Sequence, residues 1–238
     1  RRKLTALFID LLDSVGIKHT GTFGSEGARS LHYPLMVIKN GIRIAFLNYT
    51  YDTNGLIVQE PNQINVTDTN LIKQDIGRTQ LYKPDIIIAQ MHWGEEYRTT
   101  PSADQRRLAD FLLRQGVRIV IGHHPHVVQP IVMEREGEEI RNVVYYSLGN
   151  FISNQQRLDT DGGMLAEIVI GRKDAASPVV IEKCNYSLVW VQRRMDNGKV
   201  RFTLIPSWKG HKPPMEEEDK QKMDTFVQRV ERVIGHDL

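Results

Sequence analysis

The stretch that decides the fold is residues 84–126, PDIIIAQMHWGEEYRTTPSADQRRLADFLLRQGVRIVIGHHPH. Two short apolar runs rich in isoleucine and valine, Pro84–Met91 and Val117–Ile121, have the length and composition of buried strands. Residues 101–116 lie between them and predict a helix, with a proline near the start, where a missing N–H does no harm, and a glycine at the end. Strand, helix and strand form a βαβ unit, so the sequence predicts two parallel neighbouring strands in an α/β sheet.

Histidines follow both predicted strands at the point where each strand ends. His92 comes directly after the first strand, and His123, His124 and His126 follow the second in the segment GHHPH. Ligands of open α/β sheets sit beyond the carboxyl ends of the strands, so we expect these imidazoles to meet at one edge of the sheet. Neutral imidazole binds Zn²⁺, Fe and Mn²⁺ well. The sequence therefore predicts a divalent-metal site, with His124 and His126 held apart by the rigid Pro125.

Clustered histidines in a turn can instead cap strand ends and bond backbone groups. We favour metal binding for the triplet as a whole, and the position of His92 at the neighbouring strand end adds it to the same site. Within the triplet, His123 suits a structural or supporting role best, because adjacent side chains in an extended segment point in opposite directions.

Other polar residues lie where they can reach the same crevice. A carboxylate in the segment after His92 can act as a base, anchor an imidazole or contact a substrate, although a loop glutamate is usually just solvated. The segment SLGN at 147–150 either makes a tight turn or points the Asn150 amide at a substrate. The candidate substrate contacts are Glu95, Glu96, Tyr97, Asn54, Ser147 and Asn150.

Composition excludes several classes of protein. The composition of the 238-residue chain, with 40% hydrophobic and 25% charged residues, is ordinary for a soluble globular protein and supplies enough apolar side chains for a sizeable core. Its net charge of +2 gives no support for nucleic-acid binding. Cys184 is the single cysteine, so no disulfide can form within the chain, and no apolar run approaches the ~20 residues that span a membrane.

Further elements follow from local signals along the chain. Asn40-Gly41 and Asn197-Gly198 predict tight hairpin turns, and the glycine-rich segment 21–27 predicts a loop. The expected helices are 4–15, 66–82 and 215–234, and the expected strands are 17–20, 33–39, 42–49, 127–133, 142–146, 164–170, 179–191 and 200–205, with a charged turn at 134–139.

Taken together, HWGEEY at 92–97, GHHPHV at 122–127 and YSLGNF at 146–151 resemble the consecutive signatures of the CapA family, the poly-γ-glutamate capsule biosynthesis proteins. The likeness extends upstream through NGIRIAFL at 40–47 to Asn54, and it covers most of the first two thirds of the chain. Each motif alone is weak, but three linked motifs in the same order make the resemblance specific.

The CapA family is similar to the calcineurin-like metallophosphoesterases, and the resemblance implies their four-layer α/β sandwich with a two-metal site at the strand ends. It implies that His92, His124 and His126 are catalytic metal ligands, with His92 as the isolated histidine and the other two as a pair that serves both ions. Divalent Mn, Zn or Fe, as two ions in the intact protein, would clamp a phosphate-like oxyanion and lower the pKa of a bound water for in-line attack.

The resemblance also implies a substrate and a location. The substrate would be an anionic polymer of the poly-γ-glutamate type or a phosphoester, and other capsule-synthesis proteins would be partners. The protein would act in the bacterial cell envelope or outside the cytoplasm, with membrane attachment only through a segment beyond these 238 residues.

One part of the family pattern is missing from the sequence. An Asp-containing strand end and an Asn-His motif should precede the helix that begins near Leu4, and they would supply carboxylate and amide ligands. We therefore expect residues 1–238 to be the C-terminal part of one larger metallophosphoesterase-like domain. The alternative is a non-catalytic accessory or scaffold protein that binds polymer or partners in capsule assembly. A metal-free carbohydrate-binding module, based on Trp93, Tyr97 and Asn150, is a third interpretation.

Overall fold

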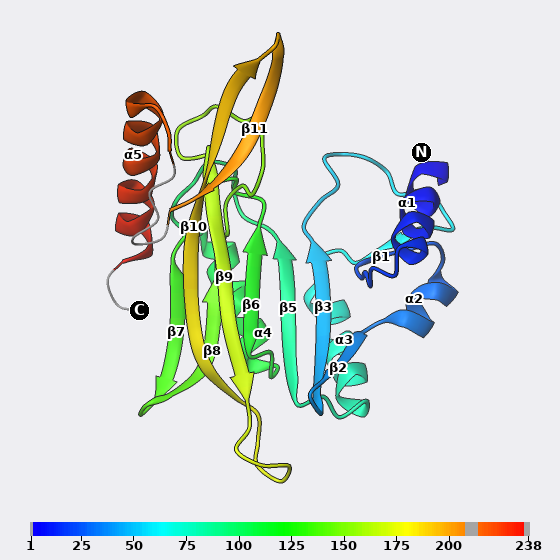
Figure 1. The fold of residues 1–238 in the computed structure, drawn as a ribbon. Coiled ribbons are helices and arrows are strands. Elements are labelled where there is room, and N and C mark those ends of the chain that lie inside the picture. The colour runs from blue at the N-terminus through cyan, green and yellow to red at the C-terminus, as the bar shows by residue number, and fades with distance from the viewer. Residues whose placement is uncertain (1, 208–213, 236–238) are drawn as a thin grey trace.

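A mixed β-sheet of nine strands forms the centre of the part of the chain that the structure describes (Figure 1). This computed structural model describes residues 2–207 and 214–235. The strands of the sheet are β2 (Leu35–Lys39), β3 (Ile42–Thr50), β5 (Ile86–His92), β6 (Ile119–His123), β7 (Ile131–Glu136), β8 (Glu139–Tyr145), β9 (Gly162–Gly171), β10 (Val180–Asp196) and β11 (Lys199–Pro206). Their order is β11-β10-β8-β6-β5-β3-β2, with β7 paired to β8 and β9 paired to β10.

Helices pack around this sheet, and a second, two-stranded sheet lies near the N-terminus (Figure 1). The small sheet pairs β1 (Thr22–Phe23) with β4 (Gln63–Ile64). The helices are α1 (Arg2–Ser14), α2 (Glu26–His32), α3 (Thr69–Leu81), α4 (Ala103–Arg114) and α5 (Glu217–Ile234). None of the helices in the described ranges combines the length and the apolar character needed to cross a membrane.

The predicted βαβ unit is confirmed. β5 and β6 are parallel neighbours, with His92 opposite His123 in register. The helix between them, α4, begins at a capping box in which Ser102 and Gln105 each accept a hydrogen bond from the other's backbone N–H. β3 pairs in parallel with the other side of β5, with Thr50 opposite His92. β8 pairs in parallel with the other side of β6, so the carboxyl ends of four parallel strands meet at one edge of the sheet.

Both faces of β5 are covered, which explains why its sequence is apolar throughout. Ile86 and Ile88 belong to a core that β9, β10 and α5 help to enclose, whereas Ile87 and Ala89 belong to the core beneath α3 and α4. A strand that is buried on both faces needs apolar side chains at nearly every position. The alternation of the four residues between two cores shows that the sheet separates two hydrophobic layers.

The expected α/β sandwich is confirmed, but its two β layers belong to one curled sheet. β10 pairs with β8 at Ile181 and Ile140 and then continues in antiparallel pairing with β9 and β11, so the second half of the sheet folds over the first. α5 packs Phe226 and Val230 into the core that this curl encloses, beside β10 (Figure 1). It covers the side of the curl rather than the outer face of β9, where Leu165 is 55% exposed.

Local signals located several other elements correctly. The two Asn-Gly pairs are hairpin turns between β2 and β3 and between β10 and β11, and all four residues have the positive φ angles that such turns require. α3 lies within the predicted range 66–82 and begins after Asp68, whose side chain accepts a hydrogen bond from the backbone N–H of Leu71. The helix predicted near the N-terminus is α1, although the apolar side chains Leu7, Phe8 and Leu11 are more than half exposed.

Three local predictions are wrong. Residues 17–20 form no strand, and the segment 21–27 contains β1 and the start of α2, which Ser25 caps. Long-range contacts explain the second error, because Arg29 of α2 bonds Asp75 and Asn65, which lie far along the chain. The charged turn at 134–139 is also shorter than expected, since β7 and β8 run into it and leave two residues at the tip.

Candidate metal centre

Two loops carry the candidate site, and each follows a parallel strand. One leaves β5 after His92, and the other leaves β6 after His123. The second loop bends through left-handed backbone conformations at His124 (φ +102°) and His126 (φ +62°), on either side of the buried Pro125. Residues other than glycine seldom adopt such angles, which cost on the order of 1–3 kcal/mol each and cluster at functional sites. The surrounding structure therefore holds both histidines in conformations that the isolated chain would avoid.

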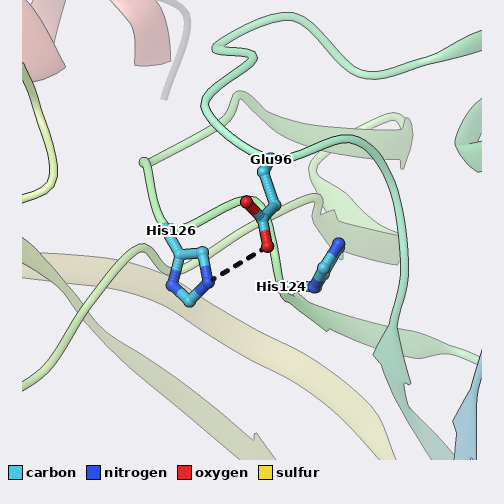
Figure 2. A group of neighbouring side chains, drawn as sticks. All are labelled: Glu96, His124 and His126. Atoms are coloured by element: carbon cyan, nitrogen blue, oxygen red, sulfur yellow. Dashed lines mark ion pairs between the residues drawn. The ribbon is translucent and has the colours of Figure 1, made fainter. Parts of the chain in front are cut away.

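Glu96, His124 and His126 form a group that can hold a metal ion (Figure 2). Each offers one ligand atom, and these atoms lie within 4.8 Å of one another. The dashed line in Figure 2 marks the ion pair between Nε2 of His126 and Oε1 of Glu96, which lie 3.9 Å apart. Two imidazoles and a carboxylate are a donor set that suits Zn²⁺, Mn²⁺ and Fe²⁺. Glu96, expected as a substrate contact, is thus placed among the potential ligands.

His92 lies beside this group. Its ring centroid is 4.6 Å from that of His124, so imidazoles from the two strand ends do converge. Its nitrogen atoms are not part of the three-residue group found among the described residues. Tyr51, in the loop after β3, stacks on His92 with centroids 5.9 Å apart and lies 4.7 Å from the ring of His124. Loops from three strand ends therefore contribute side chains to one corner.

The surroundings of the corner favour neutral imidazoles. Burial lowers the pKa of His92, His123 and His124 from the ordinary histidine value of 6.5. Neighbouring histidines lower these pKa values further: His126 acts on His92, and His92 acts on the other two, while Glu96 opposes the shift at His124. A histidine binds a metal through its neutral form. The corner therefore favours the protonation state that metal binding needs.

His123, which was counted among the four metal-binding histidines, is placed differently from the other three. Its ring has no close ring contact with them among the described residues. Its carbonyl oxygen accepts the backbone N–H of Trp93 at 3.1 Å, which ties the two loops together. Trp93 itself is 3% exposed, and its indole N–H donates to the carbonyl of Tyr146 at 2.9 Å. Trp93 is packed in the core, so it offers almost no exposed surface to a glycan.

Two residues contact the His126 ring directly. Oδ1 of Asn150 lies 3.0 Å from Nδ1 of His126. The ring of Tyr97 stacks on the same imidazole, with centroids 5.9 Å apart and an angle of 23° between the planes. The guanidinium of Arg157 lies over the ring of Tyr97, 4.2 Å from its centroid. Asn150 and Tyr97, both expected to contact the substrate, are thus in direct contact with a potential metal ligand.

The other expected substrate contacts lie outside this cluster. Ser147 is fully buried, and its hydroxyl accepts the backbone N–H of Gly149 at 3.2 Å, as in a tight turn. Glu95 is exposed and pairs with Arg98 at 3.5 Å. Asn54 is an exposed turn residue with φ +52°, and no hydrogen bond within the described ranges joins it to the histidines.

A buried pair of glutamines fixes the loop that carries Glu96. Gln105 of α4 donates from Nε2 to Oε1 of Gln129 at 2.8 Å, and Gln129 donates to the carbonyl oxygen of Arg98 at 2.7 Å. Gln129 has no exposed surface and Gln105 is 2% exposed. Buried hydrogen bonds of this kind are costly to break, because one broken bond leaves an unsatisfied polar group. The two glutamines thus anchor both loops to α4.

Sequence reasoning missed Tyr51 and Arg157 as members of the corner. Tyr51 follows a strand that proves to be parallel to β5, so the position of its loop after that strand was the available signal. Arg157 lies in an irregular segment, and no local pattern marks it.

The fold and the corner together define a class: α/β proteins with potential metal ligands at the carboxyl ends of parallel strands. Within this class, the family model described as bacterial capsule synthesis protein PGA_cap matches residues 6–155. The chain belongs to this family. The matched range contains all three motifs that suggested CapA, and the resemblance to that family is therefore confirmed.

Two curated relatives that match this chain are CapA proteins. The chain is 34% identical over 122 residues to capsule biosynthesis protein CapA of Bacillus anthracis, covering 49% of this chain and 28% of the relative. It is 34% identical over 148 residues to PGA biosynthesis protein CapA of Bacillus subtilis (strain 168), covering 60% of this chain and 35% of the relative. The chain thus spans about a third of the length of these relatives. Among solved structures, the NAD nucleotidase of Haemophilus influenzae matches with a TM-score of 0.48 and 10% identity over 98% of this chain and 45% of that one.

Proposed function

We propose that Glu96, His124 and His126 hold a divalent metal ion, with His92 beside them, and that the protein is a metal-dependent hydrolase or transferase of the metallophosphoesterase type. The single observation that carries this proposal is the approach of three ligand atoms from two loops to within 4.8 Å of one another. The strained backbone at His124 and His126 supports it, because such strain persists where function requires it.

The chain's own residues have distinct roles in this proposal. Mn, Zn or Fe bound there would supply Lewis-acid polarisation of an anionic oxygen. Asn150 and Tyr97 fix the plane of the His126 ring, and His92 is the remaining imidazole for a second ion in the intact protein. Tyr51 brings a hydroxyl on a half-exposed side chain to the same corner. The corner therefore combines ligands, positioning residues and one hydrogen-bonding group at the sheet edge.

Membership of the capsule synthesis family gives the proposed substrate. We infer that the protein acts in the synthesis, export or remodelling of an anionic polymer of the poly-γ-glutamate type. It would do so in the bacterial cell envelope, together with other capsule-synthesis proteins. A phosphoester intermediate of that process is the bond that the metallophosphoesterase chemistry would address.

Metal content and turnover test this function. The protein is purified without chelator, its Mn, Zn and Fe are measured by mass spectrometry, and hydrolysis of bis(p-nitrophenyl) phosphate is followed. We expect bound metal and metal-dependent hydrolysis in the wild type and a loss of both in His124→Ala. His32→Ala, at an exposed histidine of α2, is the matched control and should keep both. Wild-type protein that contains no stoichiometric metal after this purification would refute the proposal.

A non-catalytic scaffold is the second candidate. The observation that favours it is the small number of ligands, since the described residues contain one group of three, whereas a two-metal centre needs more. This candidate predicts no metal-dependent hydrolysis by the intact protein, together with loss of polymer binding when the corner is mutated. Turnover in the assay above would exclude it.

A further inference from the structure

A separate cavity of about 610 Å³ lies between α5, β10 and the loop 153–161. Trp190 and Val191 of β10 and Phe226 of α5 form its apolar wall, and all three are at least 95% buried. Charged and uncharged polar side chains line most of the rest of the cavity. An apolar wall with a few charged groups is the usual make-up of a ligand site.

The carboxylates around this cavity all have partners. These contacts are Asp161 with the Trp190 indole N–H at 2.9 Å, Asp219 with Gln192 and Arg194 at 2.8 and 2.7 Å, Glu218 with Lys222 at 2.6 Å, and Asp159 with Arg229 at 3.5 Å. Asp219, Glu218 and Asp159 each lie beside a cationic side chain, which offsets their charge. Asp161 is bonded to a neutral donor, so it keeps its negative charge in the cavity.

Two arginines that line the cavity differ from these acidic groups. Arg157 lies over the ring of Tyr97, and Nε of Arg193 donates to Oδ1 of Asn154 at 3.3 Å. Neither arginine pairs with a carboxylate within the described parts of the chain. A guanidinium group is charged at all physiological pH values and binds a carboxylate through two parallel N–H···O bonds. Two guanidinium groups without a carboxylate partner, against the single carboxylate of Asp161, leave an excess of positive charge next to the apolar wall.

The same loop connects the cavity to the metal corner at two points. Arg157 lines the cavity and covers Tyr97, which stacks on His126. Gln155 also lines the cavity, and its Oε1 lies 3.4 Å from the amide nitrogen of Asn150, whose Oδ1 contacts Nδ1 of His126. A chain bound in the cavity would therefore run directly beside the group of metal ligands.

We propose that this cavity is a second, metal-independent subsite that binds a carboxylate-bearing polymer segment through Arg157 and Arg193. The unit that fits has one carboxylate for a guanidinium group and a short aliphatic segment for the wall of Trp190 and Phe226. The assignment of this polymer rests on the proposed function. The subsite would hold the polymer while the bond to be cleaved or transferred lies at the corner.

Binding of a labelled oligomer tests the subsite. The probe is a fluorescein-labelled decamer of γ-linked glutamate, and its fluorescence anisotropy is measured with the 238-residue chain in EDTA at low salt. We expect Arg157→Gln/Arg193→Gln to bind the probe at least tenfold more weakly than the wild type. Arg107→Gln removes the same kind of charge from an exposed position on α4 and should stay within twofold of the wild type. Binding by the double variant within twofold of the wild type, at an unchanged Tm, would overturn the proposal.

Two further arms define the ligand and the role of arginine. Arg157→Lys/Arg193→Lys keeps the charge but loses the planar fork, so its affinity should fall between those of the wild type and the glutamine variant. Polyphosphate of matched charge should compete less well than unlabelled γ-linked glutamate, because it has no aliphatic segment to contact the apolar wall. Stronger competition by polyphosphate would refute a carboxylate subsite.

The proposed function and the subsite can fail independently. His124→Ala should lose metal and turnover yet bind the probe in EDTA as tightly as the wild type. Protein that contains no stoichiometric metal after purification without chelator, but binds the probe through the two arginines, would refute the metal-dependent enzyme and leave the subsite standing. Metal-dependent turnover together with probe binding that does not depend on the two arginines would refute the subsite and leave the enzyme standing.

Discussion

Nδ1 of His126 donates a hydrogen bond to Oδ1 of Asn150 across 3.0 Å. The direction follows from the other end of the amide, because Nδ2 of Asn150 donates to the carbonyl of Thr160 at 2.9 Å and a carbonyl oxygen can only accept. Oδ1 therefore faces the imidazole, and Nδ1 must carry the proton. This tautomer leaves a lone pair on Nε2, the atom 3.9 Å from Glu96. In the neutral ring, Nε2 is therefore the nitrogen that can accept a metal ion.

Removal of this amide should weaken metal binding. We expect Asn150→Ala to lower the affinity for Zn²⁺ or Mn²⁺ by about 10- to 100-fold, the usual effect of losing an outer partner of a ligating histidine. Asn150→Asp keeps an acceptor and should bind more tightly than the alanine variant. Competition with a chromophoric chelator measures the affinities. Asn70→Ala, on the surface of α3, should bind like the wild type, and an alanine variant at position 150 that does the same would refute this role.

Gly122, just before the histidines, has no room for a side chain. A Cβ atom there would overlap the carbonyl of Tyr146 and the indole nitrogen of Trp93, which share a hydrogen bond. We expect Gly122→Ala to lower the free energy of unfolding by about 1–3 kcal/mol, as overpacking of a core does. Urea denaturation measures this change.

The matched control for this substitution is in α3. Gly77→Ala meets no atom within 4 Å and replaces a helical glycine, so it should raise the free energy of unfolding by about 0.5–1 kcal/mol. Equal effects of the two substitutions would contradict the packing at Gly122.

Parts of this corner could be predicted because their signals are local. The β-branched runs and the helix between them specify parallel strands, and parallel strands place His92 opposite His123, one residue before His124. Glu96 could not be assigned as a ligand, because its direction depends on the positive φ angles at Gly94 and Tyr97. The sequence of a loop does not indicate that a tyrosine will adopt a positive φ angle.

The cavity beside the corner could not be predicted for a different reason. Its wall joins β10 and α5 to the loop 153–161, and these contacts form only after the sheet has curled. The same cause hid α2, whose short helix depends on the ion pair of Arg29 with the buried Asp75 at 2.7 Å. Contacts between distant parts of a chain leave no periodic pattern in either segment.

Asp85 gives a pH-dependent contribution to stability. The backbone N–H of Arg43 donates to its carboxylate at 2.7 Å, and this bond, with Arg172 and the Arg43 side chain nearby, lowers the pKa of Asp85. A lowered pKa in the folded state stabilises the protein above the unfolded pKa, and the contribution is lost as pH falls through the folded pKa. We expect Asp85→Asn to be about 1–3 kcal/mol less stable than the wild type at pH 7.

The difference between the two proteins should shrink as the pH falls below 4, because Asp85 of the wild type then takes up a proton. Urea denaturation between pH 3 and pH 7 measures it. A difference that stays constant over this range would show that the carboxylate charge is not involved. Asp104→Asn, at an exposed position of α4, should change little at any pH.

Cys184 should react slowly with thiol reagents. It is half-buried on β10, and burial raises the pKa of its thiol to about 11. Because the thiolate is the reactive form, about one molecule in 1,000 is reactive at pH 8, compared with about one in four for a free cysteine of pKa ~8.5. We expect iodoacetamide to modify the folded protein at least 100-fold more slowly than the protein in 8 M urea. Mass spectrometry of timed samples measures both rates, and rates within tenfold of each other would contradict the burial of this thiol.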